Sequence, residues 1–328
     1  MALGNSTAEV DRIVDRRRLR RKLAWWRAFG AVVLVAALAA AGAWWNGGFV
    51  ATATPHVARI MIGGLIRNDR DRLEMLDNIA KSGAKAVIVA IDSPGGTVAG
   101  SEALYDGLRR LGEKKPVVAV VQGMAASGAY IAALGTEHIV APRNSMVGSI
   151  GVLFQYPNFA GLMKTVGVEL EEIKSSPLKA APNGFTPTSP EARAAIQSLV
   201  SDSYDWFKGL VAERRGIAGD QLASASDGRV FTAHQALPLG LVDEIGDERA
   251  ARAWLAKQKG VPESLPVRDW RTGRSTEEFG WLSAGAGLML ARLGLGDLSR
   301  LLTDGAGAFG TSARLDGLLA LWHPRPGD

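Results

Sequence analysis

Between residues 57 and 134 the chain alternates short β-branched runs with segments of helical pattern. The strand-like runs are "VARIMIGGLI" (57–66), "AKAVIVAID" (84–92) and "PVVAVVQG" (116–123). The helical segments are the amphipathic 70–83, 97–112 and the stretch that follows Ser127. Strands that alternate with helices in this way form βαβ units. We therefore predict an α/β fold whose largely parallel sheet is flanked by helices.

The basic character of the chain lies at its N-terminal end. The net charge is +5, and residues 1–27 hold eight Lys and Arg against three Asp and Glu, which leaves 30 residues of each sign in the remainder. A neutral body argues against a nucleic-acid-binding surface. The absence of cysteine excludes a disulfide, a thiolate nucleophile and a cysteine-built zinc site.

Directly after this basic head, residues 28–45 form a stretch of 18 residues without a charge. Tryptophan pairs flank it at 25–26 and 44–45, as interfacial aromatic residues do. Its length is at the lower limit of the roughly 17–25 residues that span a bilayer. The arginine-rich head predicts a cytoplasmic N-terminus, with everything after residue 46 outside. A cleaved signal peptide is the alternative, which the long head disfavours. We expect a single-pass anchor in the inner (plasma) membrane.

By composition, the remainder divides into a tether (46–56), a folded domain (57–270) and a C-terminal extension (271–328). Within the folded domain a long helix is predicted over 189–216, beginning after an N-cap serine and ending at a glycine. The extension contains an apolar, Gly- and Ala-rich segment at 279–302, which Arg292 interrupts. An amphipathic or interface helix is therefore favoured there over a second membrane span.

Two loops of the predicted sheet carry groups suited to acyl-transfer chemistry. "DSPGG" (92–96) follows one strand and "GMAASG" (123–128) follows the next, and reacting groups in open α/β sheets collect at the carboxyl ends of strands. Ser127 stands at a helix N-terminus, where backbone N–H groups favour negative charge. The N–H of Gly128 and an amide from Gly95–Gly96 are suited to an oxyanion hole. The plainer alternative is that Ser127 only caps a helix and the SPGG segment is only a turn.

A serine nucleophile needs a base, and the four histidines are poorly placed for that role. They are His56 in the tether, His138, His234 and His323, and none lies in a glycine-rich loop with a carboxylate partner. A lysine kept uncharged by burial is another solution. Lys179 lies in "SSPLKAAPNGF", with no opposite charge nearby. If this loop is buried, Lys179 is suited to be the base; the alternative is an ordinary solvated lysine.

Five motifs occur in a fixed order between about residues 57 and 270: "RIMIGGLI", "VIVAIDSPGG", "GMAASGAYIAAL", "NSMVGSIGV" and "GRVFTAHQALPLGLVDEIGD". Together they resemble the signal peptide peptidase A family of membrane-anchored serine proteases, which shares its fold with Clp proteases and crotonases. The resemblance implies a Ser-Lys dyad, with Ser127 as nucleophile and Lys179 as general base. It also implies that Ser149 hydrogen-bonds the lysine and that the backbone N–H groups of Gly96 and Gly128 form the oxyanion hole. No metal or other cofactor is implied.

The resemblance further implies an assembly and a substrate. In that family the serine and lysine of one site come from different copies of the fold, so this chain is expected to form a homo-oligomer, an octamer resting on the lipid bilayer. The expected substrates are peptides, namely signal peptides that remain after preprotein cleavage. Ala129 and Ala180 depart from the family's usual residues, and Val152 stands where Clp proteases carry their histidine. Two rival functions remain: a crotonase-like acyl-CoA enzyme and a non-catalytic membrane scaffold.

Overall fold

The computed structural model describes residues 54–272 and 319–321, together with residues 22, 25–27, 29–30 and 33. The chain separates into two units, Met1–Thr54 and Pro55–Asp328, and the described residues of the first, apart from Thr54, are helical. Most of the predicted span 28–45, of the tether 46–56 and of the extension 271–328 lies outside the described residues. Among the residues that are described, no helix is both long enough and apolar enough to cross a membrane.

A mixed, mostly parallel sheet forms the centre of the second unit. Its strands are β1 (His56–Ile66), β2 (Ala84–Thr97), β3 (Val117–Ala126), β4 (His138–Ala141), β5 (Met146–Gly148), β6 (Val230–Thr232), β7 (Glu244–Ile245), β8 (Val267–Trp270) and β9 (Leu319–Leu321). The main path runs β6-β5-β3-β2-β1-β8; β4 also pairs with β3, β7 with β4, and β9 with β2. Only β6 and β9 run antiparallel to their partners among the described strands.

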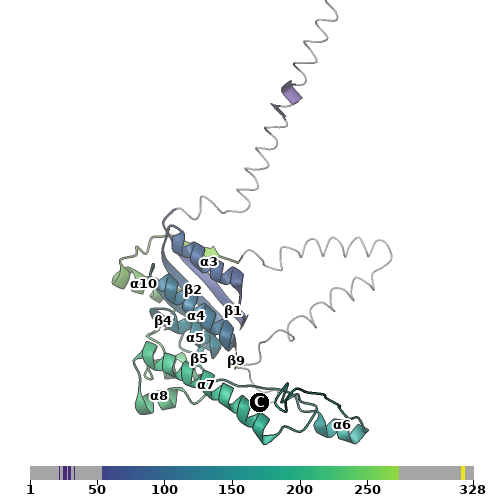
Figure 1. Cartoon of the computed structure of the whole chain (residues 1–328). Helices are drawn as coiled ribbons and strands as arrows, with labels where there is room; N and C mark the ends of the chain where they lie inside the picture. Colours follow the sequence, from purple (N-terminus) through teal and green to yellow (C-terminus); the bar gives the residue numbers. More distant parts are fainter. Residues whose placement is uncertain are drawn as a thin grey trace, which may run out of the picture. The chain divides into compact units, whose positions relative to one another are not determined.

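Helices cover both faces of this sheet (Figure 1). The helices of this unit are α3 (Arg70–Lys81), α4 (Val98–Gly112), α5 (Gly128–Leu134), α6 (Ala160–Val166), α7 (Pro190–Arg215), α8 (Gly219–Ala225), α9 (Ala233–Ala236) and α10 (Glu248–Lys259), of which α6 lies away from the sheet. On β2, Val87 and Val89 pack into the core beneath α3, α4 and α5, whereas Ala86 and Ile88 pack toward α10. Because both faces are buried, the strand has a continuous apolar sequence. The predicted α/β fold is confirmed.

The long helix predicted over 189–216 is α7. The Ser189 side chain accepts a hydrogen bond from the Ala192 N–H, and Gly216 ends the helix in the left-handed conformation, with φ of 64°. A proline at the first turn and a glycine after the last are the usual limits of a helix. Local sequence signals therefore located this element to within a residue at each end.

The loop predicted at residues 92–96, including a turn at SPGG, is wrong, because β2 continues in extended form to Thr97. Its end pairs with β1, with Leu65 opposite Gly95 and Ile66 opposite Gly96. A Cβ atom on Gly96 would lie 1.8 Å from the Ile66 carbonyl oxygen. The glycine at this position thus permits a close approach of two strands, which a local reading of Gly and Pro residues does not distinguish from a turn.

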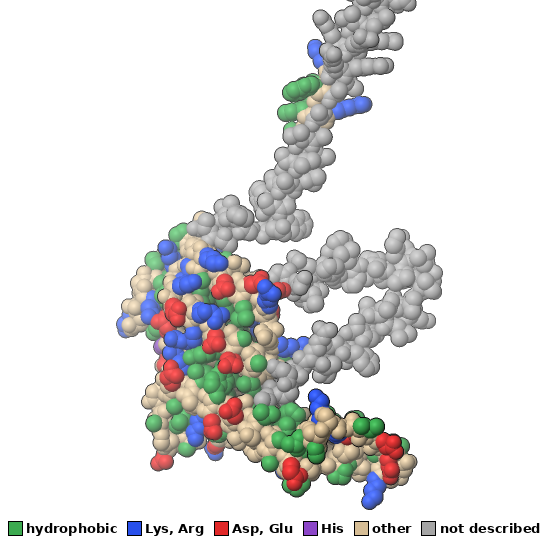
Figure 2. Space-filling view, in the orientation of Figure 1, with side chains coloured by type: hydrophobic (Ala, Val, Ile, Leu, Met, Phe, Trp, Pro, Cys, Tyr) green, Lys and Arg blue, Asp and Glu red, His purple; other side chains and the backbone are tan. Residues whose placement is uncertain are grey.

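Residues 154–188 form an arm between β5 and α7, and α6 lies within it (Figure 1). The arm is held together by local contacts: the Phe159 N–H donates to the Gly184 carbonyl at 2.7 Å, and the Tyr156 and Thr188 hydroxyls lie 2.7 Å apart. Many of its apolar side chains are exposed, as Figure 2 shows. These are Phe159, Leu162, Val166, Val168, Leu170, Ile173, Leu178 and Phe185.

Candidate active site

Ser127 occupies the junction between β3 and α5, where the chain turns sharply. Its backbone has φ of 54° and ψ of −118°, an unusual conformation for a residue other than glycine, and only 1% of its surface is exposed. The Ser127 N–H donates to the Gly148 carbonyl at 2.7 Å, and the Ser127 carbonyl accepts from the Tyr130 N–H at 2.9 Å. Strained backbone maintained by its surroundings clusters at functional sites.

The Ser127 hydroxyl is only weakly engaged within the chain. It donates to the Gly151 carbonyl at 3.4 Å, at the long limit for a hydrogen bond. The next residue, Gly128, is the first of α5, and its N–H has no hydrogen-bond partner among the described residues. A buried hydroxyl beside a free amide matches the arrangement expected of a nucleophile and an oxyanion donor.

Ser149 lies next to Ser127 because β3 and β5 are parallel neighbours. Ala126 is paired with Gly148, so each serine directly follows the last residue of its strand. Ser149 has φ of 50°, is 8% exposed, and donates its N–H to the Arg229 carbonyl at 2.8 Å. Its hydroxyl makes no hydrogen bond to any described residue. The structure thus brings two buried serines together that are far apart in the sequence.

Gly96 reaches the same edge of the sheet from the other side of β3. On β2, Ser93 is paired with Ala125, so Gly96 and Ser127 both lie just beyond the last pair of the two strands. The buried Ser93 hydroxyl donates to the Gly64 carbonyl at 2.6 Å and accepts from the Gly95 N–H at 3.1 Å. These bonds fix the end of β2, and a sequence-based search for acid–base groups overlooks them.

Lys179 is not at this edge. It lies on the arm with its side chain exposed, and no hydrogen bond connects it to Ser127 or Ser149 within the described part of the chain. Lys179 was expected to be a base only if its loop were buried. In the single chain the loop is not buried, because it projects from the sheet and has few buried neighbours. Among the described residues of one chain, no basic side chain is hydrogen-bonded to the serine.

None of the described histidines can take the place of Lys179 as the base for Ser127. His138 is paired with Val118 on β3, nine residues before Ser127, or about 30 Å at the rise of a β-strand. It lies beside Glu244, with 3.2 Å between Nε2 and Oε2, and stacks on Trp254. His234 is exposed on α9. His56, predicted in the tether, instead begins β1 and is buried against Trp270.

Helix α5, which begins directly after Ser127, is fixed at both ends by groups that sequence patterns did not identify. The fully buried Tyr130 hydroxyl donates to the Leu241 carbonyl at 2.7 Å, and burial raises its pKa, so it stays a neutral donor. At the other end of α5, Arg214 of α7 donates to the Leu134 and Thr136 carbonyls at 2.9 and 3.0 Å. In the sequence, the one signal that could have indicated this contact was the single tyrosine in the otherwise small and aliphatic segment "GAYIAAL".

Metal ligands are a separate question. No group of three or more His, Asp and Glu side chains able to hold a metal ion occurs among the described residues.

The sheet order, the helices on both faces and the buried serine at a strand-to-helix junction define an α/β protease fold of the Clp type. In agreement, the sequence model of Clp protease matches residues 59–148, and that of peptidase family S49 matches residues 109–262. The chain belongs to peptidase family S49, the family of signal peptide peptidase A and related serine proteases.

Individual relatives agree with this assignment. The chain is 38% identical over 215 residues to slr0021 of Synechocystis, whose name carries a provisional assignment as a protease; the match covers 65% of this chain and 78% of that protein. It is 31% identical over 239 residues to the chloroplastic serine protease SPPA of Arabidopsis thaliana, covering 72% of this chain and 35% of the relative. It is 33% identical over 165 residues to protease 4 of Haemophilus influenzae, covering 49% of this chain and 26% of that one. The chain thus spans only about a quarter to a third of the two longer relatives.

Proposed function

We propose that this chain is a serine endopeptidase in which Ser127 is the nucleophile and Lys179 the general base. The observation that carries the proposal is the conformation of Ser127, a buried serine with φ of 54° whose hydroxyl is weakly bonded and whose neighbour Gly128 presents a free amide. A strand-to-helix turn of this kind presents the nucleophile in α/β-hydrolases. A residue needed only for packing has no reason to adopt it.

In the proposed reaction the Ser127 hydroxyl attacks the peptide carbonyl and Lys179 accepts its proton. The backbone N–H groups of Gly96 and Gly128 stabilise the oxyanion, and removing one such donor typically costs about 100–1000-fold in turnover. Lys179 then protonates the leaving amine, and water that the same lysine activates hydrolyses the acyl-enzyme. Ser149, adjacent to Ser127, orients the lysine amine.

We propose that the lysine of each site comes from a neighbouring subunit of a homo-oligomer, an octamer. Lys179 lies on an arm whose apolar side chains face solvent, among them Leu162 at 62%, Val166 at 63% and Ile173 at full exposure. Exposed apolar surface of this extent typically marks an interaction site. A second copy of this chain would cover this surface and carry Lys179 to the next Ser127 in the same step.

The proposal includes a location and a substrate class. Residues 28–45, preceded by the basic head, would anchor the chain in the inner membrane with the peptidase unit on the extracytoplasmic side. Substrates would be peptides rich in small and apolar residues, of which signal peptides released by preprotein processing are the expected example. A groove shielded from water would both bind such peptides and favour the neutral lysine.

Three variants test the dyad. Ser127→Ala and Lys179→Ala should each lower peptide hydrolysis by about 10³-fold or more. Lys164→Ala is the matched control, because Lys164 is an exposed lysine on the same arm. All three should keep the circular dichroism spectrum and the size of the parent assembly. Full activity in Lys179→Ala would remove the lysine from the mechanism.

A fluorophosphonate probe separates the proposal from its two rivals. The probe should label the full chain at Ser127 and leave Ser127→Ala unlabelled, because it reacts covalently with activated serines. A crotonase-like acyl-CoA enzyme would use the glycine amides without a nucleophile, and a scaffold would need neither. Absence of labelling in the assembled wild-type protein would favour these rivals.

A further inference from the structure

Ser93 carries a buried hydroxyl that the proposed mechanism does not use. It is completely buried on β2, three residues before Gly96. Its Oγ donates to the Gly64 carbonyl of β1 at 2.6 Å and accepts from the Gly95 N–H at 3.1 Å. A hydroxyl inside a sheet costs free energy unless such bonds satisfy it. The backbone groups that Ser93 binds therefore indicate what the residue does.

These bonds lie where the regular pairing of the sheet is interrupted. The pairing of β1 with β2 shifts register just before Leu65, and that of β2 with β3 shifts just before Ser93. An interrupted ladder leaves backbone N–H and C=O groups without their usual strand partners. The Ser93 hydroxyl supplies a partner to one group on each strand of the first interruption, Gly64 on β1 and Gly95 on β2.

The contact with Gly95 restrains the peptide unit that joins Gly95 to Gly96. Gly95 has φ of 107°, a conformation that residues other than glycine rarely adopt, and it has no side chain to limit its rotation. The peptide unit carries the Gly96 N–H, which the proposed mechanism assigns to the oxyanion hole. The Ser93 Oγ lies 3.1 Å from the Gly95 nitrogen and 3.5 Å from the Gly95 carbonyl oxygen. The hydroxyl thus holds the backbone directly before the Gly96 amide.

We propose that Ser93 is a positioning residue that fixes the direction of the Gly96 N–H in the oxyanion hole. This inference rests on the proposed function for the role of that amide. An oxyanion donor stabilises the transition state only when it is held in advance where the charge develops. A displacement of about 1 Å in an active site can cost about 100-fold in rate. Because the charge develops only in the transition state, loss of the Ser93 hydroxyl should lower kcat and leave KM unchanged.

The variant Ser93→Ala in the full chain gives the first test. Its kcat for a peptide substrate should fall about 10- to 100-fold. The factor should be the same at every pH, because Ser93 does not titrate and the proposed base is untouched. A changed KM with an unchanged kcat, or a loss that varies with pH, overturns the assignment.

Ser101→Ala is the matched control. Ser101 is also completely buried and donates to a backbone carbonyl, that of Thr97, at 2.9 Å, but it has no hydrogen bond to Gly95 or Gly96 in the described part of the chain. Both variants should lower the urea midpoint of unfolding, and only Ser93→Ala should lower kcat. Equal losses of kcat in the two would assign the effect to a general loosening of the fold.

Ser93→Thr separates the hydroxyl from the packing of the side chain. It keeps the oxygen that binds Gly64 and Gly95, so it should keep most of the parent kcat. A loss in Ser93→Thr as large as that in Ser93→Ala would show that the shape of the side chain matters and the hydroxyl does not.

Amide hydrogen exchange provides a readout that does not require activity. The segment 93–97 should exchange faster in Ser93→Ala than in the parent, because the Gly95 N–H loses its acceptor, and Ser101→Ala should leave it unchanged. Unchanged exchange in Ser93→Ala overturns the restraint on the backbone, and faster exchange with an unchanged kcat overturns its link to catalysis. A parent protein that cleaves no peptide refutes the proposed function instead, so the two failures are distinguishable.

Discussion

Gly96 lies at the point where β2 passes closest to β1, and this contact makes it sensitive to the addition of a single methyl group. In Gly96→Ala the new Cβ would lie 1.8 Å from the Ile66 carbonyl oxygen and 2.6 Å from its carbon, so the backbone of one strand has to move. We expect a loss of at least about 1–3 kcal/mol in the free energy of unfolding, the usual cost of overpacking. We also expect loss of peptide hydrolysis, since the movement displaces the amide assigned to the oxyanion hole. Urea unfolding and peptidase assays measure the two effects.

Gly63 is the matched control on the neighbouring strand. A Cβ at Gly63 would meet its nearest atom, the Asp92 carbonyl oxygen, at 3.8 Å, an ordinary contact distance. Gly63→Ala should therefore keep most of its stability and activity. If both variants behave alike, the special role assigned to Gly96 is wrong.

The residues of the site differ in how far sequence could locate them. The position of Ser127 between a strand and a helix follows from local signals alone, whereas its role as a nucleophile came from the family resemblance and stays a prediction. Its neighbour Ser149 could be placed only by resemblance, because their proximity depends on the pairing of β3 with β5. For Lys179 even the structure of a single chain does not show the assigned role. Its loop is exposed, and its role as a base stays a prediction about the assembly.

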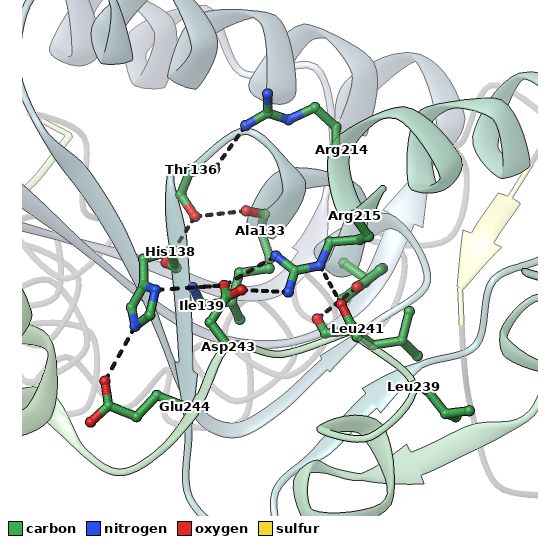
Figure 3. A network of polar contacts seen from close by, with 12 residues as sticks. Ala133, Thr136, His138, Ile139, Arg214, Arg215, Leu239, Leu241, Asp243 and Glu244 are labelled. Carbon is green, nitrogen blue, oxygen red and sulfur yellow. Dashed lines mark hydrogen bonds and ion pairs between the residues drawn. The ribbon is translucent and has the colours of Figure 1, made fainter. Parts of the chain in front are cut away.

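At the scale of elements, the end of α7 is tied to the rest of the unit by a carboxylate (Figure 3). Arg215 donates to both oxygens of Asp243, at 3.0 and 2.6 Å, and the same carboxylate accepts from the Ile139 N–H at 2.7 Å. Burial is the largest single influence and opposes the charge of Arg215, but the hydrogen bond to Asp243 and the electrostatic interactions around the guanidinium together outweigh it and raise its pKa. The carboxylate thus joins α7, β4 and the loop that precedes β7.

Asp243→Ala should therefore destabilise the fold strongly. It leaves Arg215, whose side chain is 11% exposed, charged without its partner, and removes the acceptor of Ile139. We expect a loss of about 2–4 kcal/mol in the free energy of unfolding, measured by urea titration. Glu74→Ala is the control, because Glu74 pairs with Arg70 on the surface of α3, where such pairs contribute about 0–1 kcal/mol. Equal losses in the two variants would contradict the role given to the Asp243 carboxylate.

A second ion pair connects strands β1 and β8 and makes stability depend on pH. The Arg59 side chain donates to Asp269 at 2.5 Å, and this hydrogen bond lowers the pKa of the Asp269 carboxyl. A lowered folded-state pKa contributes stability above the unfolded value, about 3.9, and this contribution is lost as the pH falls through the folded value. Both side chains are more than a third exposed, so the contribution should stay below about 1 kcal/mol.

The variant Asp269→Asn isolates this contribution. Its melting temperature should lie below that of the parent at pH 7, and the difference should shrink as the pH is lowered toward 2, because the parent carboxyl is increasingly protonated. Thermal unfolding followed by circular dichroism at both values measures it. A difference of the same size at pH 7 and pH 2 would show that the amide disturbs packing and that the ion pair contributes nothing.

The elements that sequence predicted and those it missed differ in burial. The strands β1, β2 and β3 were predicted from their apolar runs and the helices α3, α4 and α7 from their helical patterns and end signals, and the structure confirms each of them. The continuation of β2 to Thr97 was missed because its pairing is made by glycine backbone close to β1. The arm was not predicted as a structure, since apart from the short helix α6 it has no regular element and many of its apolar side chains are exposed.

At the scale of the whole molecule, the distribution of the proposed catalytic groups is the central feature. The peptidase unit holds the serine, its neighbouring serine and the glycine amides at one edge of the sheet, whereas Lys179 lies on the projecting arm. Apolar surface on that arm needs a partner, and the serine needs a base. Assembly of identical chains satisfies both requirements with one interface.

Mixed assemblies test this arrangement directly. Ser127→Ala keeps an intact lysine and Lys179→Ala keeps an intact serine, so each alone should be inactive. When the two are co-expressed with different tags and purified through both, random mixing places an intact serine beside an intact lysine at about a quarter of the sites, provided each site takes its two groups from adjacent subunits of a closed ring. We therefore expect about a quarter of the wild-type rate per chain, measured with a peptide substrate. A site built within one chain predicts no recovery, because every chain then lacks one of its two groups, and an inactive mixture of confirmed hetero-oligomers would exclude the shared site.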